Sequence, residues 1–197
     1  MSHDHHHDAR DRRTLWIVLA LNFSMFVVEI WQGLAAHSTS LLADSMDFLS
    51  DSFSYGITLY VLSRPLRMRA HASLIKALLM LLLAAGALAQ GGYNIAAGNL
   101  PTAEVMGIVG TMALAINLIS AWLLYRSRNR DSNMQSVWLC SRNDAIANIA
   151  IILAAGAVSL TQSLWPDMIV ALFIAWLEGS SALKIIAQAQ GELRHGQ

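Results

Sequence analysis

Two pairs of polar side chains, each spaced four residues apart, lie within otherwise apolar segments of this sequence. The pairs are Asp47/Asp51 and Cys140/Asp144. Four residues of α-helix advance about 400°, so both members of each pair share one helix face. An aspartate in mid-membrane costs about 2.5–3.5 kcal/mol on insertion scales. A divalent cation held between the two helices would offset that cost, so the three carboxylates and the thiol predict a metal site.

The first pair belongs to a longer acidic stripe. Asp44, Asp47 and Asp51 follow at i, i+3 and i+7 and therefore lie on one face of a helix. Such a stripe must face the interior of a helix bundle or a water-filled cavity. The alternative is that the aspartates lie in an exposed loop and the apolar span begins later. That alternative leaves too few apolar residues before Arg64 to cross a bilayer.

The second pair continues into Asn148, so that Cys140, Asp144 and Asn148 recur on one face at every fourth position. A free cysteine alone is often only a small buried hydrophobe, but its place on one stripe with Asp144 favours a ligand. Arg142 lies on the far side of the same helix. There it either extends toward the membrane surface or pairs with Glu178.

Apolar segments of membrane-spanning length must position these side chains. Hydrophobic residues make up 55% of the chain and charged residues only 13%, against about a quarter charged in soluble domains. The segments are roughly 15–36, 41–62, 74–92, 105–125, 137–160 and 168–186. Each is close to the ~20 residues that a helix needs to cross about 30 Å of hydrocarbon. We therefore expect an all-α bundle of six transmembrane helices over 14–190, with short tails at 1–13 and 191–197.

The basic residues predict the orientation of the bundle. All 13 Lys and Arg residues fall at or near one side: before the first segment, or around the ends that follow the second, fourth and sixth. The turns near Ser38, Asn99 and Gln162 carry none. The positive-inside rule places both termini in the cytoplasm, as in a multi-pass protein of the cell membrane. The formal net charge is zero, so no nucleic-acid partner is expected.

The geometry of two antiparallel helices predicts how the four ligands meet. Asp51 would lie level with Cys140, and Asp47 with Asp144. A compact set of four such ligands suits tetrahedral coordination, as Zn²⁺ prefers. The ligands must lose any bound protons when a metal enters. One site could therefore exchange a metal ion for protons.

Two further groups of polar residues give weaker signals. Glu29, in the outer half of the first segment, could neighbour Asp44 along an ion's route out. The N-terminal tail intersperses aspartates with four histidines, His3, His5, His6 and His7. These side chains could capture Zn²⁺-like ions weakly at the cytoplasmic mouth. The alternative is a solvated tail with no essential role.

These motifs resemble those of the cation diffusion facilitator family. That family has a glutamate in helix one, an S-L-x-x-D sequence and an [H/D]xxxD metal-binding pair in helix two, and a matching pair in helix five. The corresponding stretches here are Val28-Glu29, Ser40–Asp51 and Cys140–Asn148. The resemblance implies a homodimer that exports Zn²⁺-like divalent cations from the cytoplasm, driven by proton entry, through alternating inward-open and outward-open states.

By position, Asp47, Asp51 and Asp144 fall on the ligand positions of that family, while Cys140 falls where the family usually has His or Asp. A thiolate softens the site, which favours Cd²⁺ alongside Zn²⁺ as the transported ion. The chain also ends at Gln197, soon after the sixth segment, without the family's usual cytoplasmic metal-sensing domain. Any homodimer would then form through the membrane helices.

An alternative function is a membrane metal receptor or accessory subunit that binds an ion without moving it. A third hypothesis is an integral-membrane enzyme that uses a metal-bound water. An enzyme is not expected, because the site lacks a nearby general base beyond its own ligands and the sequence contains no Ser/His/Asp arrangement, phosphate-binding loop or CxxC motif. Nor is a prosthetic group expected, so the metal would be cargo.

Overall fold

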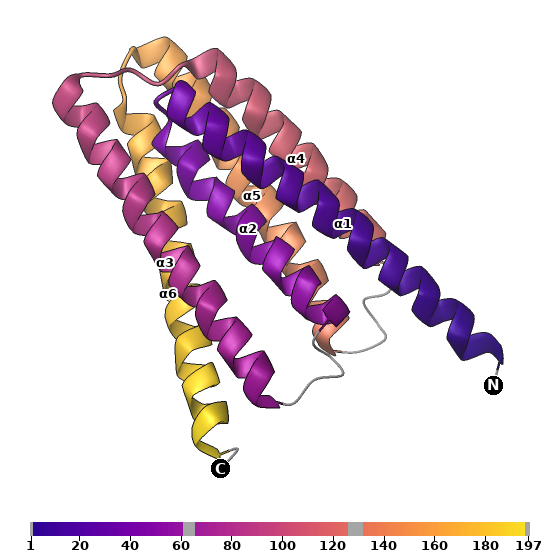
Figure 1. Cartoon of the computed structure of the whole chain (residues 1–197). Coiled ribbons are helices and arrows are strands. Elements are labelled where there is room, and N and C mark those ends of the chain that lie inside the picture. Colours follow the sequence, from indigo (N-terminus) through magenta and orange to yellow (C-terminus); the bar gives the residue numbers. More distant parts are fainter. Residues whose placement is uncertain (1, 61–65, 126–131, 196–197) are drawn as a thin grey trace.

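The computed structural model describes the backbone of residues 2–60, 66–125 and 132–195, and the side chains of 12–59, 68, 70–125, 144–191 and 193. This part of the chain forms six helices and no strand, which confirms the predicted all-α fold (Figure 1). The helices are α1 (Ser2–Ala35), α2 (Thr39–Tyr60), α3 (Leu66–Ala97), α4 (Ala103–Tyr125), α5 (Ser132–Thr161) and α6 (Trp165–His195). Since α1 begins at Ser2, the backbone of the histidine-rich segment is part of the first helix.

Helix α2 is the centre of the bundle and contacts each of the other helices. Around it, α1 packs on α4, α4 on α5, and α3 on α6 (Figure 1). Every residue from Ser38 to Met46 is buried, so the polar side chains of this stretch are kept away from lipid. Because α2 begins at Thr39 and includes all three aspartates, the interpretation of the acidic stripe as an exposed loop is wrong.

Five of the described helices are long and apolar enough to cross a membrane: α1, α3, α4, α5 and α6. Helix α2 is not in this set, because every 18-residue window within it contains Asp44, Asp47 and Asp51. Its 22 residues nevertheless run alongside the other helices in the interior of the bundle, where composition alone is a poor guide (Figure 1). We therefore treat α2 as the sixth membrane-spanning helix.

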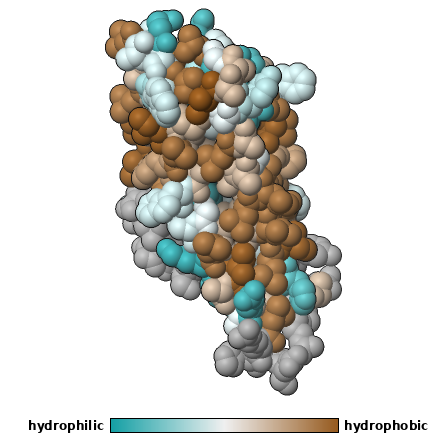
Figure 2. Space-filling model, turned by 90° about the vertical axis from the view of Figure 1, so that its left-hand side faces the viewer, coloured by the Kyte–Doolittle hydropathy of each residue, from teal (hydrophilic) through white to brown (hydrophobic). Residues whose placement is uncertain are grey.

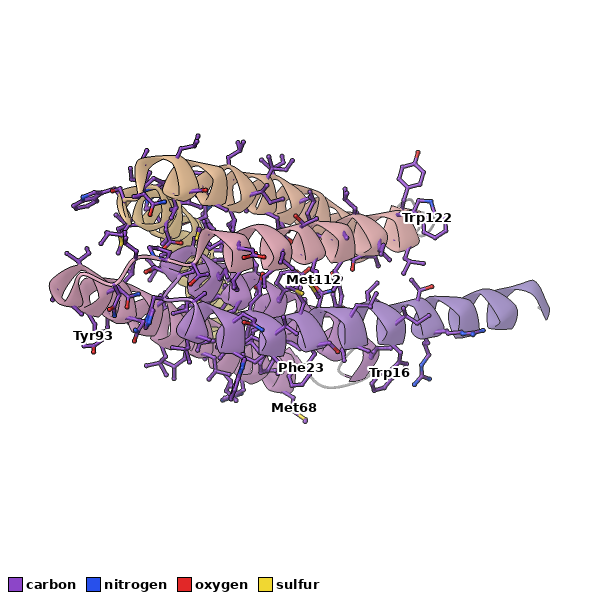
Figure 3. All side chains as sticks on the ribbon, turned by 90° about the horizontal axis from the view of Figure 1, so that it is seen from above. Trp16, Phe23, Met68, Tyr93, Met112 and Trp122 are labelled. Carbon is purple, nitrogen blue, oxygen red and sulfur yellow. The ribbon has the colours of Figure 1, made fainter. Side chains whose placement is uncertain are left out.

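The outer surface of the bundle suits a lipid environment. Figure 2 shows hydrophobic side chains along most of one face, with hydrophilic ones mainly nearer the ends. Trp16 on α1 and Trp122 on α4 project outward toward one end, and Tyr93 on α3 projects toward the other (Figure 3). Amphipathic aromatic residues commonly mark both edges of a membrane. The chain is a multi-pass protein of the cell membrane.

The two ends of the bundle differ in charge. We call the end where α1 begins and α6 ends the basic end, because the described side chains of Arg12, Arg13 and Lys184 are exposed toward it. At the opposite end, the turn between α1 and α2 is tied to α6. Asp167 accepts hydrogen bonds from Ser38 Oγ at 2.8 Å and from the Thr39 amide at 2.7 Å. This carboxylate caps the start of α2 and so fixes the height of the aspartates along the bundle.

Candidate metal centre

The acidic stripe of α2 lies inside the bundle. Asp44 is fully buried, Asp51 is 9% exposed, and Asp47 is half-buried. From Asp44 to Asp51 the stripe rises by seven residue steps, or about 10 Å along the helix. All three carboxylates interact electrostatically with side chains from neighbouring helices rather than with solvent alone. The helix therefore presents a column of negative charge to its partners.

The predicted face of α5 meets this column. The side-chain amide of Asn148 donates a hydrogen bond to Asp44 Oδ2 and accepts one of 2.9 Å from Asn117 Nδ2 on α4. One turn away, Asp144 interacts electrostatically with Asp51 and with Asp47. The backbone of Cys140 lies one turn further toward the start of α5, but its side chain is outside the described residues. The structure thus brings Asp144 to the α2 aspartates and leaves the thiol as a prediction.

Glu29 of α1 completes the end of the column nearest the start of α2. It is fully buried, and its carboxyl group interacts electrostatically with that of Asp44. Within the part of the chain that the structure describes, both Glu29 oxygens and Asp44 Oδ1 are buried without a hydrogen-bond donor. Two such carboxyl groups side by side require a shared proton or a cation. The proximity expected between Glu29 and Asp44 is present, and its role in an ion's route stays a prediction.

Glu178 of α6 is a member of the cluster that the sequence reasoning did not assign to the site. Its half-buried carboxylate lies within direct interaction range of Asp47 and also acts on Asp51 and Asp144. The sequence feature that could have indicated this residue is a lone glutamate within an apolar segment. The predicted pairing of Glu178 with Arg142 stays a prediction, because the side chain of Arg142 is outside the described residues.

Tyr55 is a second residue that the sequence did not single out. Its hydroxyl donates a hydrogen bond of 2.7 Å to Asp51 Oδ2. The ring is fully buried against Leu15 and Val18 of α1 and Leu124 of α4. A ligand carboxylate held by such a donor has a restricted orientation. The sequence could have indicated this contact, because Tyr55 follows Asp51 by four residues and therefore lies on the same helix face.

The cluster is rich in oxygen donors but is not a closed cage. Among the described side chains, no three His, Cys, Asp or Glu residues come together closely enough to hold one ion. Asp47, Asp51 and Asp144 nevertheless share one interior region, where like charges raise the free energy of the metal-free protein. A divalent cation would draw them together and remove that repulsion.

Comparison with known proteins agrees with this architecture. Residues 15–193 match the family model of the cation efflux transmembrane domain, and the chain belongs to that family. This match confirms the resemblance to cation diffusion facilitators that the motifs indicate.

Two curated relatives cover most of the chain. It is 24% identical over 205 residues to the metal cation efflux system protein CzcD of Cupriavidus metallidurans, with 94% of the chain covered. It is 23% identical over 210 residues to the zinc transporter ZitB of Pectobacterium atrosepticum, with the whole chain covered. The chain spans 65% of the length of CzcD and 66% of the length of ZitB.

Proposed function

We propose that this protein exports divalent transition-metal cations from the cytoplasm in exchange for protons. The observation that carries the proposal is the gathering of buried and half-buried carboxylates from α1, α2, α5 and α6 inside a lipid-facing bundle. Intramembrane acidic groups are costly and mark ion or proton pathways. CzcD is described as a metal cation efflux protein and ZitB as a zinc transporter, and both names support the same class of activity.

The metal ligands in this proposal are Asp47, Asp51, Cys140 and Asp144. Carboxylates alone favour hard cations, whereas a thiolate adds affinity for Zn²⁺ and Cd²⁺. Glu178 supplies further negative charge beside Asp47. The metal is cargo, so its binding must be reversible.

Proton coupling follows from the chemistry of the same ligands. Carboxylates and a thiol bind a metal only after losing their protons, so metal entry releases protons and proton entry favours metal release. The basic end faces the cytoplasm by the positive-inside rule, and access to the site alternates between the two ends of the bundle. Homodimers form through membrane helices. The proposal is for a transporter rather than an enzyme.

The decisive experiment is metal uptake into proteoliposomes under an imposed pH gradient, with Zn²⁺, Cd²⁺ and Mn²⁺ tested in turn. The wild type should accumulate Zn²⁺ and Cd²⁺ only while the gradient lasts. Asp51→Asn should abolish uptake, while Glu104→Gln, which alters an exposed carboxylate in the first turn of α4, should not. Asp51→Asn transporting at the wild-type rate would overturn the site.

A second variant tests the thiol. Cys140→His should lower the preference for Cd²⁺ over Zn²⁺, because imidazole is a harder ligand than thiolate. An unchanged preference would remove Cys140 from the ligand set. If the wild type binds these ions but moves none under any gradient, the protein is a membrane metal receptor, and the transport proposal is wrong.

A further inference from the structure

A polar cavity lies next to the carboxylate cluster, toward the basic end. Its volume is about 190 Å³, and it is bounded by α2, α3 and α6. Ser54 and Thr58 line it from α2, Lys76 from α3 and Gln188 from α6. Ser54 and Thr58 follow Asp51 at i+3 and i+7, so the cavity continues along the face of α2 that carries the acidic stripe.

Lys76 points into the bundle rather than along the membrane surface. It is half-buried and lies six residues beyond Ala70, where the apolar span of α3 begins. Its ammonium group donates a hydrogen bond of 2.6 Å to Ser54 Oγ across the interface with α2. A lysine near a helix end usually extends to the interface, because burying an ammonium group is costly. The contact with Ser54 instead holds the charge one turn from Asp51.

The ammonium group acts on the cluster itself. It attracts the carboxylates of Asp51 and Asp144 electrostatically. Among the side chains that the structure describes, it is the cation that acts on both. Such attraction is strong in the low-dielectric interior and is screened little by salt.

We infer that Lys76 is a built-in counter-cation of the metal site, which compensates Asp51 and Asp144 in the metal-free protein and competes with the incoming divalent cation. The inference rests on the proposed function, since it assumes that these carboxylates bind metal. An ion that enters from the basic end through the cavity meets the ammonium group first and must replace its charge as the counter-ion of the carboxylates. Competition of this kind weakens binding enough for release, which a transporter needs.

Titration of the purified full-length protein in detergent with Cd²⁺ and with Zn²⁺ tests this inference. Lys76→Gln should lower the Kd by about tenfold or more, because a positive charge near a divalent ion is removed. The same variant should transport more slowly at saturating metal, because release becomes harder. Lys76→Arg keeps the charge and should stay within about twofold of the wild type. The control Lys184→Gln, an exposed lysine on α6, should leave the Kd unchanged.

Ser54→Ala provides a second variant if Lys76→Gln does not fold. It keeps the ammonium group but removes the acceptor that holds it beside Asp51, so the Kd should fall by a smaller factor. A wild-type or higher Kd in both variants overturns the counter-cation role of Lys76. Wild-type protein that binds neither Cd²⁺ nor Zn²⁺ instead overturns the proposed function, so the two failures are distinguishable.

Discussion

The hydroxyl of Tyr55 donates a 2.7 Å hydrogen bond to Asp51 Oδ2, one turn earlier on the same helix. The tyrosine ring is fully buried, so the position of this donor is set by packing rather than by solvent. One oxygen of Asp51 is thereby oriented. A group that fixes a ligand's orientation typically changes metal affinity by about 10–100-fold when it is removed.

We therefore expect Tyr55→Phe to raise the Kd for Cd²⁺ by about tenfold while leaving the fold intact, because the ring is kept and only the hydroxyl is lost. Calorimetric titration of the purified protein measures this change. Tyr93→Phe is the matched control, since Tyr93 is 61% exposed on α3. Equal Kd values for Tyr55→Phe and the wild type would show that Asp51 needs no orienting donor.

The paired amides of Asn117 and Asn148 predict a coupled loss of stability. Asn148→Ala should destabilise the protein by about 1–3 kcal/mol, because it leaves the Asn117 amide and the Asp44 carboxylate without this partner. Asn117→Ala should cost less, since Asn148 keeps its bond to Asp44. Unfolding in detergent of both single variants and the double variant gives the coupling. If the losses of unfolding free energy in the two single variants add up to the loss in the double variant, the two amides are not coupled.

The carboxylate of Asp167 predicts a stability effect at the opposite end of the bundle. It is 1% exposed and accepts hydrogen bonds from the Ser38 and Ser40 hydroxyls and the Thr39 amide. Asp167→Ala should cost about 2 kcal/mol or more, because it removes the cap of α2 and leaves buried donors unpaired. Glu104→Gln is the control, as another first-turn acid that is exposed. Equal unfolding temperatures for the two variants would exclude this role.

The sequence predicted all six helices, because apolar length and helical period depend on local pattern alone. Three of them, α1, α3 and α6, extend well beyond the predicted apolar segments, since a helix can continue past the residues that would lie in lipid. It also predicted that Asp44 and Asn148 lie on facing helices. The roles of Asp167 and Lys76 were not predicted. Asp167 caps a helix that begins 128 residues earlier in the chain, a relationship that only tertiary packing creates. From the sequence, Lys76 was only one of the basic residues near the cytoplasmic side. The orientation of its side chain into the bundle depends on the contact with Ser54, which the sequence does not show.

The cluster of carboxylates was predicted only in outline. The stripe at Asp44, Asp47 and Asp51 follows from helical spacing, and the structure keeps it on one buried column. Glu178 was assigned elsewhere, because a single glutamate in an apolar helix carries no information about which neighbour it faces. Composition alone would leave α2 out of the set of membrane-spanning helices, because its three aspartates lower its mean hydropathy. Its contacts with every other helix show that this polar face is covered.

Two neighbouring glycines on α3 offer a final prediction about how closely α3 approaches α2 and α6. A Cβ at Gly91 would lie 2.5 Å from Met168 Cε and 2.8 Å from Thr39 Cγ2, whereas a Cβ at Gly92 would have no neighbour within 4 Å. The methionine can move, but Thr39 is held through its amide by Asp167. Gly91→Ala should therefore cost about 1–3 kcal/mol, and Gly92→Ala should gain up to about 1 kcal/mol from helix propensity.

Thermal unfolding of the two alanine variants in the same detergent measures the difference. Both substitutions add one methyl group and raise helix propensity equally, so only the contacts at Gly91 separate them. A shift of α3 away from α2 would also move Lys76 from Ser54, and Gly91→Ala should then bind Cd²⁺ with an altered Kd while Gly92→Ala does not. If Gly91→Ala is as stable as Gly92→Ala, α3 does not approach the start of α2 as closely as Thr39 and Gly91 indicate.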